Sequence, residues 1–340
     1  MFRLTKTSRI LGFLGCLGLL VSCSPRVATS FWRIGTPADS TRAGYTVIHA
    51  EGKTRHCYPI TEWTADPAVD TYHQLHHHGV AVESEHMAYR IYFDKKQTID
   101  PYCKRTLQLE LATSHWYPND SLLAAGYGDD ILRVSGTVGV GSVKYWNGHK
   151  MVHIEPVAER SQRTVQQTRT SATIEVAVKG WEIPKSQITN YKSQIVDLAV
   201  QYTLRAGHRD MRCDVSLSEA VEGLCTGVQF IPAKSSAPRT PSDTSIIILP
   251  NGVLLASWGT DWPVNDSAKY AKETVGLAVF IPKAYAGALV HDKQNNLCLL
   301  KGTTPHFYLT CVGATKENHP VATNATEWLI YLRRWAKHLR

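Results

Sequence analysis

Apolar and polar residues alternate along much of the chain after about residue 85. From 196 to 204 every second residue is apolar, and the alternation resumes at 211–217 after a glycine-containing turn. Successive strand side chains point to opposite faces, so this pattern predicts a hairpin with one buried face. A second hairpin is predicted where 245–249 and 253–257 flank Pro250-Asn251-Gly252.

The same two-residue period predicts further strands at 89–93, 107–111, 174–178 and 275–281. Many short strands with few helical stretches between them indicate a large antiparallel β-sandwich. One helix is predicted, at 324–339. Trp328, Leu332 and Trp335 fall at helical spacing there, and Asn324 can cap the first turn. We therefore expect a mostly β fold with a C-terminal helix.

The N-terminus has the features of an export signal. Residues 1–9 contain basic and no acidic side chains, and 10–21 form an apolar run too short to span a bilayer. Leu20-Val21-Ser22-Cys23 resembles a bacterial lipobox, which implies cleavage before Cys23 and lipidation of its thiol. An ordinary signal peptide cut a few residues later is the alternative. We expect a periplasmic protein, lipid-anchored to the outer membrane.

These features divide the chain into a signal peptide (1–22), a tether and N-terminal segment (23–50) and a single β domain (51–340). The segment 233–244 has the composition of a linker, but the strand patterning is similar on both sides of it. We interpret it as a long surface loop within the domain.

The formal net charge of +8 includes three charges of residues 1–9, and basic and acidic residues are interspersed beyond them. Without a run of Lys or Arg or a recognition helix, nucleic acid is not an expected partner. A mildly basic surface does suit acidic glycans. No second apolar run is long enough to span a membrane, so the lipid on Cys23 would be the membrane contact.

Six of the eight cysteines lie after residue 23. An even number in an oxidising compartment permits disulfides. Cys213 with Cys225, and Cys298 with Cys311, each bracket an expected hairpin and are the preferred pairs. No CxxC or Cys/His spacing of a zinc site is present.

A polar segment at 71–104 combines a histidine run with carboxylates, tyrosines and an arginine. Removing a proton next to a carboxylate requires a base such as His or Tyr, and a cation that neutralises the substrate acid. The alternative is structural, with Arg90 paired across strands and the histidines capping a loop. Together with the turn at 207–210, this segment supplies the candidate catalytic residues His77, His78, Glu83, Glu85, Tyr89, Arg90 and His208.

Two further segments offer substrate contacts. Lys144 and Trp146 share a strand face, a cation beside an aromatic ring, and tryptophans amid Asp and Asn at 258–266 can stack on sugars. Packing of these aromatic rings in the core is the alternative. Gly139 and Gly141 lack the lysine of a phosphate-binding loop, so we exclude a nucleotide site. The candidate substrate-binding residues are Tyr92, Lys104, Asp130, Lys144, Trp258, Asp261 and Trp262.

No cofactor is expected, although His73 and His77 have helical spacing and could bind a divalent metal with Glu83 or Glu85. This signal has low specificity, because histidine-rich stretches bind divalent ions readily.

Several motifs in combination resemble domain-of-unknown-function family 4861: His76-His77-His78-Gly79, Glu83-Ser84-Glu85, Tyr89-Arg90-Ile91-Tyr92-Phe93-Asp94, Gly128-Asp129-Asp130, Gly207-His208-Arg209-Asp210 and Trp258-Gly259-Thr260-Asp261-Trp262-Pro263. The resemblance covers roughly residues 55–285. Members occur mainly in secreted proteins of Bacteroidetes, among glycan-degradation genes. It implies a galactose-mutarotase-like supersandwich that acts on oligosaccharides containing uronic acid, and it supplies no established catalytic residues.

The leading hypothesis is a lyase or dehydratase that removes the proton alpha to a uronate carboxylate and expels the C4 substituent. A cation would come from Arg90, Lys104 or Lys144. A hydrolase would instead use two of Glu83, Glu85, Asp129 and Asp130. A sugar epimerase or mutarotase is a third hypothesis, and a non-catalytic glycan-binding protein that uses Trp258 and Trp262 is a fourth. All four depend on the histidine run, the strand after it and the tryptophan turn surrounding a single hollow.

Overall fold

The computed structural model describes residues 26–50, 53–66, 68–69, 71–114, 118–183, 193–232, 244–264 and 270–339. The expected signal peptide (1–22), the lipidation site Cys23 and nearly all of the linker-like segment 233–244 lie outside the described residues. Within the described part, no helix is both long and apolar enough to cross a membrane.

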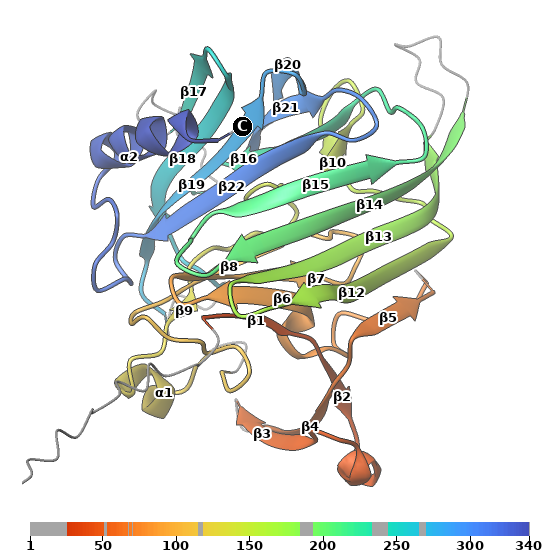
Figure 1. Cartoon of the computed structure of the whole chain (residues 1–340), viewed down its shortest axis with the longest axis vertical. Coiled ribbons are helices and arrows are strands. Elements are labelled where there is room, and N and C mark those ends of the chain that lie inside the picture. The colour runs from red at the N-terminus through yellow and green to blue at the C-terminus, as the bar shows by residue number, and fades with distance from the viewer. Residues whose placement is uncertain are drawn as a thin grey trace, which may run out of the picture.

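A nine-stranded antiparallel sheet forms the largest layer (Figure 1). In sheet order its strands are β17 (Thr244–Leu249), β18 (Gly252–Asp261), β19 (Glu273–Pro282), β22 (His306–Gly313), β15 (Met211–Leu217), β14 (Gln194–Arg205), β13 (Ser171–Ile183), β12 (Glu159–Gln167) and β5 (Glu62–Ala65). Leu204 of β14 pairs with Met211 of β15, and the apolar positions of both strands are buried. The predicted hairpin is confirmed, as is the β17–β18 hairpin.

Three smaller sheets complete the fold. One contains β1 (Val27–Ser30), β6 (Gly79–Ser84), β7 (Met87–Tyr92), β8 (Ile99–Cys103) and β9 (Asp129–Asp130). Another contains β11 (Met151–Val152), β10 (Lys144–Trp146), β16 (Leu224–Gln229), β21 (Asn295–Leu300) and β20 (Ala286–His291). The third contains β2 (Trp32–Gly35), β4 (Lys53–Pro59) and β3 (Thr46–Ala50). Strands β1 and β6 contact β13, and β16 contacts β18 and β19, so both five-stranded sheets pack on the large sheet.

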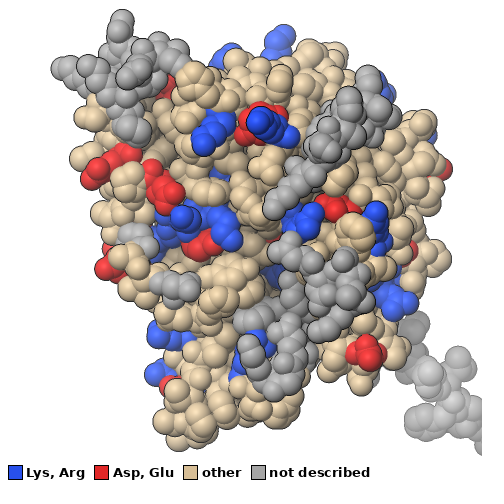
Figure 2. Space-filling model, turned by 180° about the vertical axis from the view of Figure 1, so that it is seen from behind, with Lys and Arg blue, Asp and Glu red and all other residues tan. Residues whose placement is uncertain are grey.

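Charges of both signs are interspersed on the face of the molecule seen from behind (Figure 2). Lys and Arg side chains lie beside Asp and Glu side chains there, and neither sign gathers into a large patch on the described surface of this view. The surface therefore agrees with the mixed charge pattern of the sequence.

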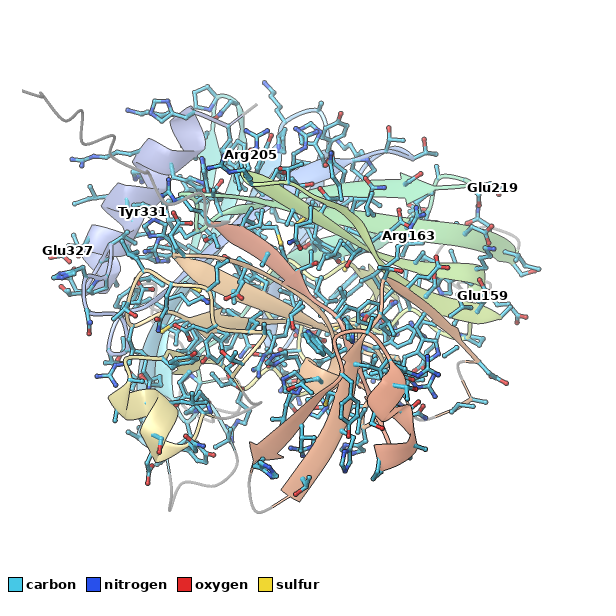
Figure 3. All side chains as sticks on the ribbon, turned by 60° about the horizontal axis from the view of Figure 1, so that its bottom comes forward. Glu159, Arg163, Arg205, Glu219, Glu327 and Tyr331 are labelled. Carbon is cyan, nitrogen blue, oxygen red and sulfur yellow. The ribbon has the colours of Figure 1, made fainter. Side chains whose placement is uncertain are left out.

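The predicted C-terminal helix is confirmed as α2 (Ala325–Lys337), which lies over β18 and β19. The Asn324 side chain accepts a hydrogen bond from the backbone N–H of Glu327 at 3.0 Å and so caps the helix. Glu327 lies in the first turn and Tyr331 one turn later (Figure 3). Trp328 is buried against the sheet. The other helical turns of the described chain are the short helix α1 (Asp120–Ala124) and the 3-10 helices η1 (Pro37–Thr41) and η2 (His76–His78).

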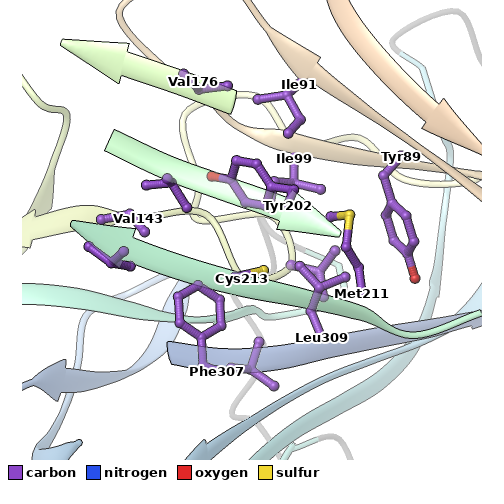
Figure 4. Packing of buried hydrophobic residues seen from close by; sticks show 14 of the residues in the cluster. Tyr89, Ile91, Ile99, Val143, Val176, Tyr202, Met211, Cys213, Phe307 and Leu309 are labelled. Atoms are coloured by element: carbon purple, nitrogen blue, oxygen red, sulfur yellow. The ribbon is translucent and has the colours of Figure 1, made fainter. Parts of the chain in front are cut away.

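The main core lies between the large sheet and the two five-stranded sheets (Figure 4). Ile91 of β7 and Ile99 of β8 belong to the same buried cluster as Tyr202 of β14 and Leu309 of β22. Burial of apolar surface at this scale is the dominant favourable term in folding. The fold is thus mostly β, sandwich-like and closed by a C-terminal helix, as predicted.

One strand prediction is wrong. The strand predicted at 107–111 is an irregular loop, because the backbone N–H of Leu111 is bound by the Glu83 carboxylate at 2.9 Å, whereas Leu107 is exposed. The tether and N-terminal segment expected at 23–50 contains β1, β2 and β3, and β1 pairs with β6. Residues 27–50 are therefore part of the folded domain.

The predicted disulfides are also wrong, because all six described cysteines are free and buried. Cys213 lies on β15 of the large sheet and Cys225 on β16 of a five-stranded sheet. Strands β21 and β22, which hold Cys298 and Cys311, are likewise in different sheets. In both cases the chain crosses between layers, so the bracketed segment is not a hairpin.

Candidate active site

Arg90 of β7 lies in the interior of the small sheet, where it binds two carboxylates. Its Nη2 donates to Asp100 Oδ2 at 2.8 Å and to Asp130 Oδ2 at 2.7 Å, and only 2% of the residue is exposed. The Tyr92 hydroxyl donates to Asp100. Burial, and then the charge of Asp130, raises the pKa of Asp100 to about 7 despite the Arg90 cation. The burial of this cluster favours a structural role for it.

Glu83 of β6 holds the loop that follows β8. Its carboxylate binds the Lys104 ammonium and accepts backbone N–H bonds from Glu110 at 2.7 Å and Leu111 at 2.9 Å. Glu83 and Lys104 are both buried. A buried ion pair with its remaining lone pairs satisfied is costly to break, so Glu83 fixes the loop 104–111 over the sheet.

The histidine run forms η2 beneath the same loop. A ring nitrogen of His77 bonds the Leu111 carbonyl at 2.8 Å, and one of His78 bonds the Tyr72 carbonyl at 2.8 Å. Burial lowers the pKa of His77, and lowers that of His78 to about 3, so both rings are neutral near pH 7. Both residues adopt left-handed backbone angles, φ 58° and 60°. The run therefore anchors a loop, in agreement with a structural role.

A cavity of about 270 Å³ opens at the end of the sheet where β7 begins, and we call it the smaller cavity. It is lined by His86, Lys104, Arg105, Thr106, Leu107, Arg209, Glu317, Asn318 and His319.

The β6–β7 turn packs against the β14–β15 turn at this cavity. Ser84 Oγ donates to the His208 carbonyl at 2.6 Å, and Glu85 accepts from the Gly207 N–H at 3.1 Å. The Tyr89 hydroxyl donates to the Arg209 carbonyl. The structure thus brings together two segments that were predicted to share a site, although they lie more than a hundred residues apart in the chain.

Arg209 and Glu317 form the fixed wall of the smaller cavity. Two guanidinium nitrogens of Arg209 contact the Glu317 carboxylate at 3.0 and 3.1 Å, and Nη1 also donates to the Cys311 carbonyl at 3.2 Å. Burial opposes the charge of Arg209, but the Glu317 carboxylate outweighs it and raises the pKa of the guanidinium. A bidentate pair of this kind holds both groups in one orientation.

The remaining cavity groups combine a neutral imidazole with positive charge. Burial, and then the charge of Arg209, lowers the pKa of His86, so the ring is available as a proton acceptor near pH 7. Arg105 donates to the Leu123 carbonyl at 3.0 Å and forms no ion pair with a described residue. Its charge is therefore free for an anionic ligand.

Other predicted residues lie outside the smaller cavity. His208 is exposed and bonds Asp210 at 3.1 Å. Trp258 packs near Trp328 of α2, with ring centroids 6.5 Å apart. Asp261 binds Arg133 at 3.0 Å. Lys272 lies 4.2 Å over the Trp262 ring.

Lys144 is fully buried and binds the Lys96 carbonyl and Thr98 Oγ1, which lies at 3.0 Å. A second, larger cavity of about 660 Å³ lies near Tyr72 and Asp94. Neither cavity is lined by Trp258, Asp261 or Trp262. The three predicted segments therefore do not meet around either of these hollows, because strand pairing directs them to different edges of the sheets.

A metal site does not appear in the described part of the chain, where no three His, Cys, Asp or Glu side chains are grouped to hold an ion. His77, one of the two expected ligands, uses a ring nitrogen to bind the Leu111 carbonyl.

The family model named DUF4861, a domain of unknown function, matches residues 35–340. The chain belongs to the DUF4861 family. The match extends further in both directions than the resemblance in the sequence, and it includes β3, α2 and the Glu317–His319 wall of the smaller cavity. A comparison with curated proteins found no match.

Sequence reasoning missed most of the residues that line the smaller cavity of this DUF4861 chain. His86 follows the predicted Glu83-Ser84-Glu85 motif, but its ring was not selected, and Arg209 was overlooked beside His208. The polar run Glu317-Asn318-His319 lies in a loop before α2, which is a usual location for functional residues. That loop position was the signal that could have identified it.

Proposed function

We propose that this chain is an exported, lipid-anchored periplasmic protein that acts on uronic-acid-containing oligosaccharides and eliminates the C4 substituent of a uronate. The observation that carries the proposal is His86, an imidazole with a lowered pKa in a cavity that three cationic side chains also line. Removal of a proton next to a carboxylate requires a neutral base to accept the proton and a positive charge to stabilise the carboxylate.

In this mechanism Arg105 binds the uronate carboxylate and stabilises the negative charge that develops on it. His86 takes the proton from C5. The electrons of the C5–H bond form the C4–C5 double bond, the C4–O bond breaks, and His319 gives a proton to the departing oxygen. The products are an unsaturated uronate and either water or the alcohol of a second sugar.

The size of the smaller cavity supports action on a single sugar residue. Its volume of about 270 Å³ is just below the range of roughly 300–1,000 Å³ common for ligand pockets. The substrate residue would therefore be a terminal uronate, with the rest of the oligosaccharide outside the cavity.

Elimination is favoured over hydrolysis by the carboxylates available. A hydrolase needs two carboxyl groups roughly 5–9.5 Å apart on either side of the bond. Glu317 is the one carboxylate among the described lining residues, and Arg209 binds it in a bidentate pair. Epimerisation begins with the same proton removal, so the assay has to separate the two reactions.

The assay uses the purified mature chain and a series of acidic oligosaccharides, with ultraviolet absorbance and product mass as readouts, in deuterated water. Elimination gives absorbance and either loss of water or an unsaturated fragment. Deuterium uptake without absorbance would instead indicate epimerisation. Carboxyl-reduced oligosaccharides are the matched control and should give no product. Absence of both absorbance and exchange across the series would refute the proposal.

Lipid anchoring is tested separately through Cys23. The chain should incorporate a labelled fatty acid in cells, and the Cys23→Ala variant should not, because the thiol that carries the lipid is lost. Equal labelling of the two proteins, or of neither, would contradict the proposed anchor.

A further inference from the structure

The larger cavity lies at the opposite end of β7 from the smaller one. Its walls come from the segment after β5, the turn after β7 and the segment that leads into β12. His86 precedes β7 and Asp94 follows it, so at about 3.3 Å per residue the two cavities are roughly 25 Å apart. The larger cavity is therefore a separate site.

Arg160 is a buried cation that lines the larger cavity, and a second buried cation, Lys144, interacts with its charge without lining the cavity. Neither forms an ion pair with an acidic side chain in the described part of the chain. Arg160 is 4% exposed, and its Nη2 donates to the Ile154 carbonyl at 3.0 Å. Its Nη1 finds no acceptor among the described residues. Lys144 is fully buried and binds only carbonyl and hydroxyl oxygens of the described chain. Burial above all, with the charge of Arg160 nearby, lowers the pKa of Lys144 to about 7.

Three acidic side chains line the larger cavity, and two of them are held in turns of their own. Asp94 accepts from the Lys96 N–H at 2.8 Å and pairs with the Lys96 ammonium at 3.2 Å. Asp66 accepts from the Ala68 N–H at 2.8 Å. Neither these two nor the exposed Glu155 forms an ion pair with Arg160, although the charges of Asp94 and Glu155 favour its charged form. A buried guanidinium without a carboxylate is costly, and an anionic ligand would offset that cost.

Tyr72 supplies an aromatic wall to the same cavity. Its ring is stacked on His78 with centroids 3.7 Å apart and meets the edge of Tyr92 at 5.3 Å. These contacts fix the ring, and a fixed tyrosine beside a cation is suited to a sugar that bears a carboxylate.

We propose that the larger cavity is a second binding site, which holds an acidic sugar through its carboxylate at Arg160 and its ring beside Tyr72. The assignment of the ligand as a sugar rests on the proposed function. Its negative charge is inferred independently, from the Arg160 guanidinium, which forms no ion pair with a described carboxylate. This site would bind a second uronate of the oligosaccharide, distinct from the uronate that reacts in the smaller cavity.

Isothermal titration with trigalacturonate tests this site in the His86→Gln background, in which turnover is slowed. Two binding events are expected. Arg160→Gln should weaken one of them about tenfold or more, because charge-assisted hydrogen bonds are lost. Arg163→Gln is the matched control, because Arg163 lies on the same strand (Figure 3) and is exposed. It pairs with Glu175 at 2.7 Å, so both binding events should remain.

A second pair of variants leaves the buried cations in place. Val69 lies in the cavity wall and is 51% exposed, so substitution there should not disturb the fold. Val69→Glu should weaken trigalacturonate binding about threefold at low salt, with the effect fading at high salt, whereas Val69→Gln should bind like the parent.

Equal binding by Arg160→Gln, Val69→Glu and their controls would overturn the second site. Equal affinity for carboxyl-reduced trigalacturonate would do the same. If Arg160-dependent binding persists while no acidic oligosaccharide yields an unsaturated product, the proposed function fails and the second site stands.

Discussion

The interior of the small sheet and the rim of the smaller cavity contain the same kinds of side chain in different surroundings. Arg90 is surrounded by Asp100, Asp130 and Tyr102, and Glu83 accepts three hydrogen bonds from its neighbours. His86 and Arg105, in contrast, each keep an open side toward the cavity. The difference shows that residue type does not identify a reactive group; what matters is whether neighbouring groups already use its polar atoms.

The largest effect is expected for Arg90→Met, which leaves two buried carboxylates without their cation. Unfolding in urea should show a loss of about 3–5 kcal/mol. The control Arg163→Met breaks an exposed ion pair and should cost about 0–1 kcal/mol. A stable Arg90→Met protein that has lost turnover would reverse the comparison and make Arg90 a reacting group.

The next effect concerns the cavity rim. His86→Gln should lower the rate of unsaturated product formation about a hundredfold or more, because the proton acceptor is removed, with little change in stability. His149→Gln is the control, since His149 is exposed in the β10–β11 turn. Unchanged turnover in the His86 variant would place the chemistry elsewhere.

A smaller effect is expected in the pH dependence of stability. The folded pKa of Lys144 is lowered to about 7 from 10.5, so between these values the unfolded chain binds the extra proton. Its contribution to stability therefore grows as pH rises from 7, by up to about 1.4 kcal/mol per unit, and is lost as pH falls toward 7. Lys144→Met should remove this slope in urea unfolding between pH 7 and 8.5. Parallel curves for the two proteins would show that burial does not oppose this charge.

The smallest effect is expected on reduction. Dithiothreitol should leave the unfolding midpoint unchanged, and denatured mature protein should titrate six unlipidated thiols, because the described cysteines are free. A reductant-dependent loss of about 2–5 kcal/mol, typical of a native disulfide, would contradict the structure.

Much of the fold was predictable because its signals are local. The alternation in β14 and β15 and the helical spacing of α2 depend on residues a few positions apart, and both appear in the structure as expected. The strand predicted at 107–111 shows the limit of this reasoning. Its apolar alternation is real, but Glu83, distant in the chain, binds the backbone that a strand neighbour would have paired.

The site was predictable only in part. The motifs that converge on the smaller cavity were recognised, since the Ser84–His208 and Tyr89–Arg209 contacts join two of them. The sequence did not show which residues of those motifs are exposed in the cavity and which are buried in the sheet. Arg209 binds Glu317, which is 108 residues away, and no local pattern connects the two.

The sequence by itself determined several long strands, the two hairpins, the C-terminal helix and the family, because periodicity and motif order are properties of neighbouring residues. The tertiary structure alone decided which polar groups are paired in the interior, which face a cavity, and that the described cysteines are free. Those outcomes depend on how the layers pack, and packing brings together residues whose separation in the chain carries no signal.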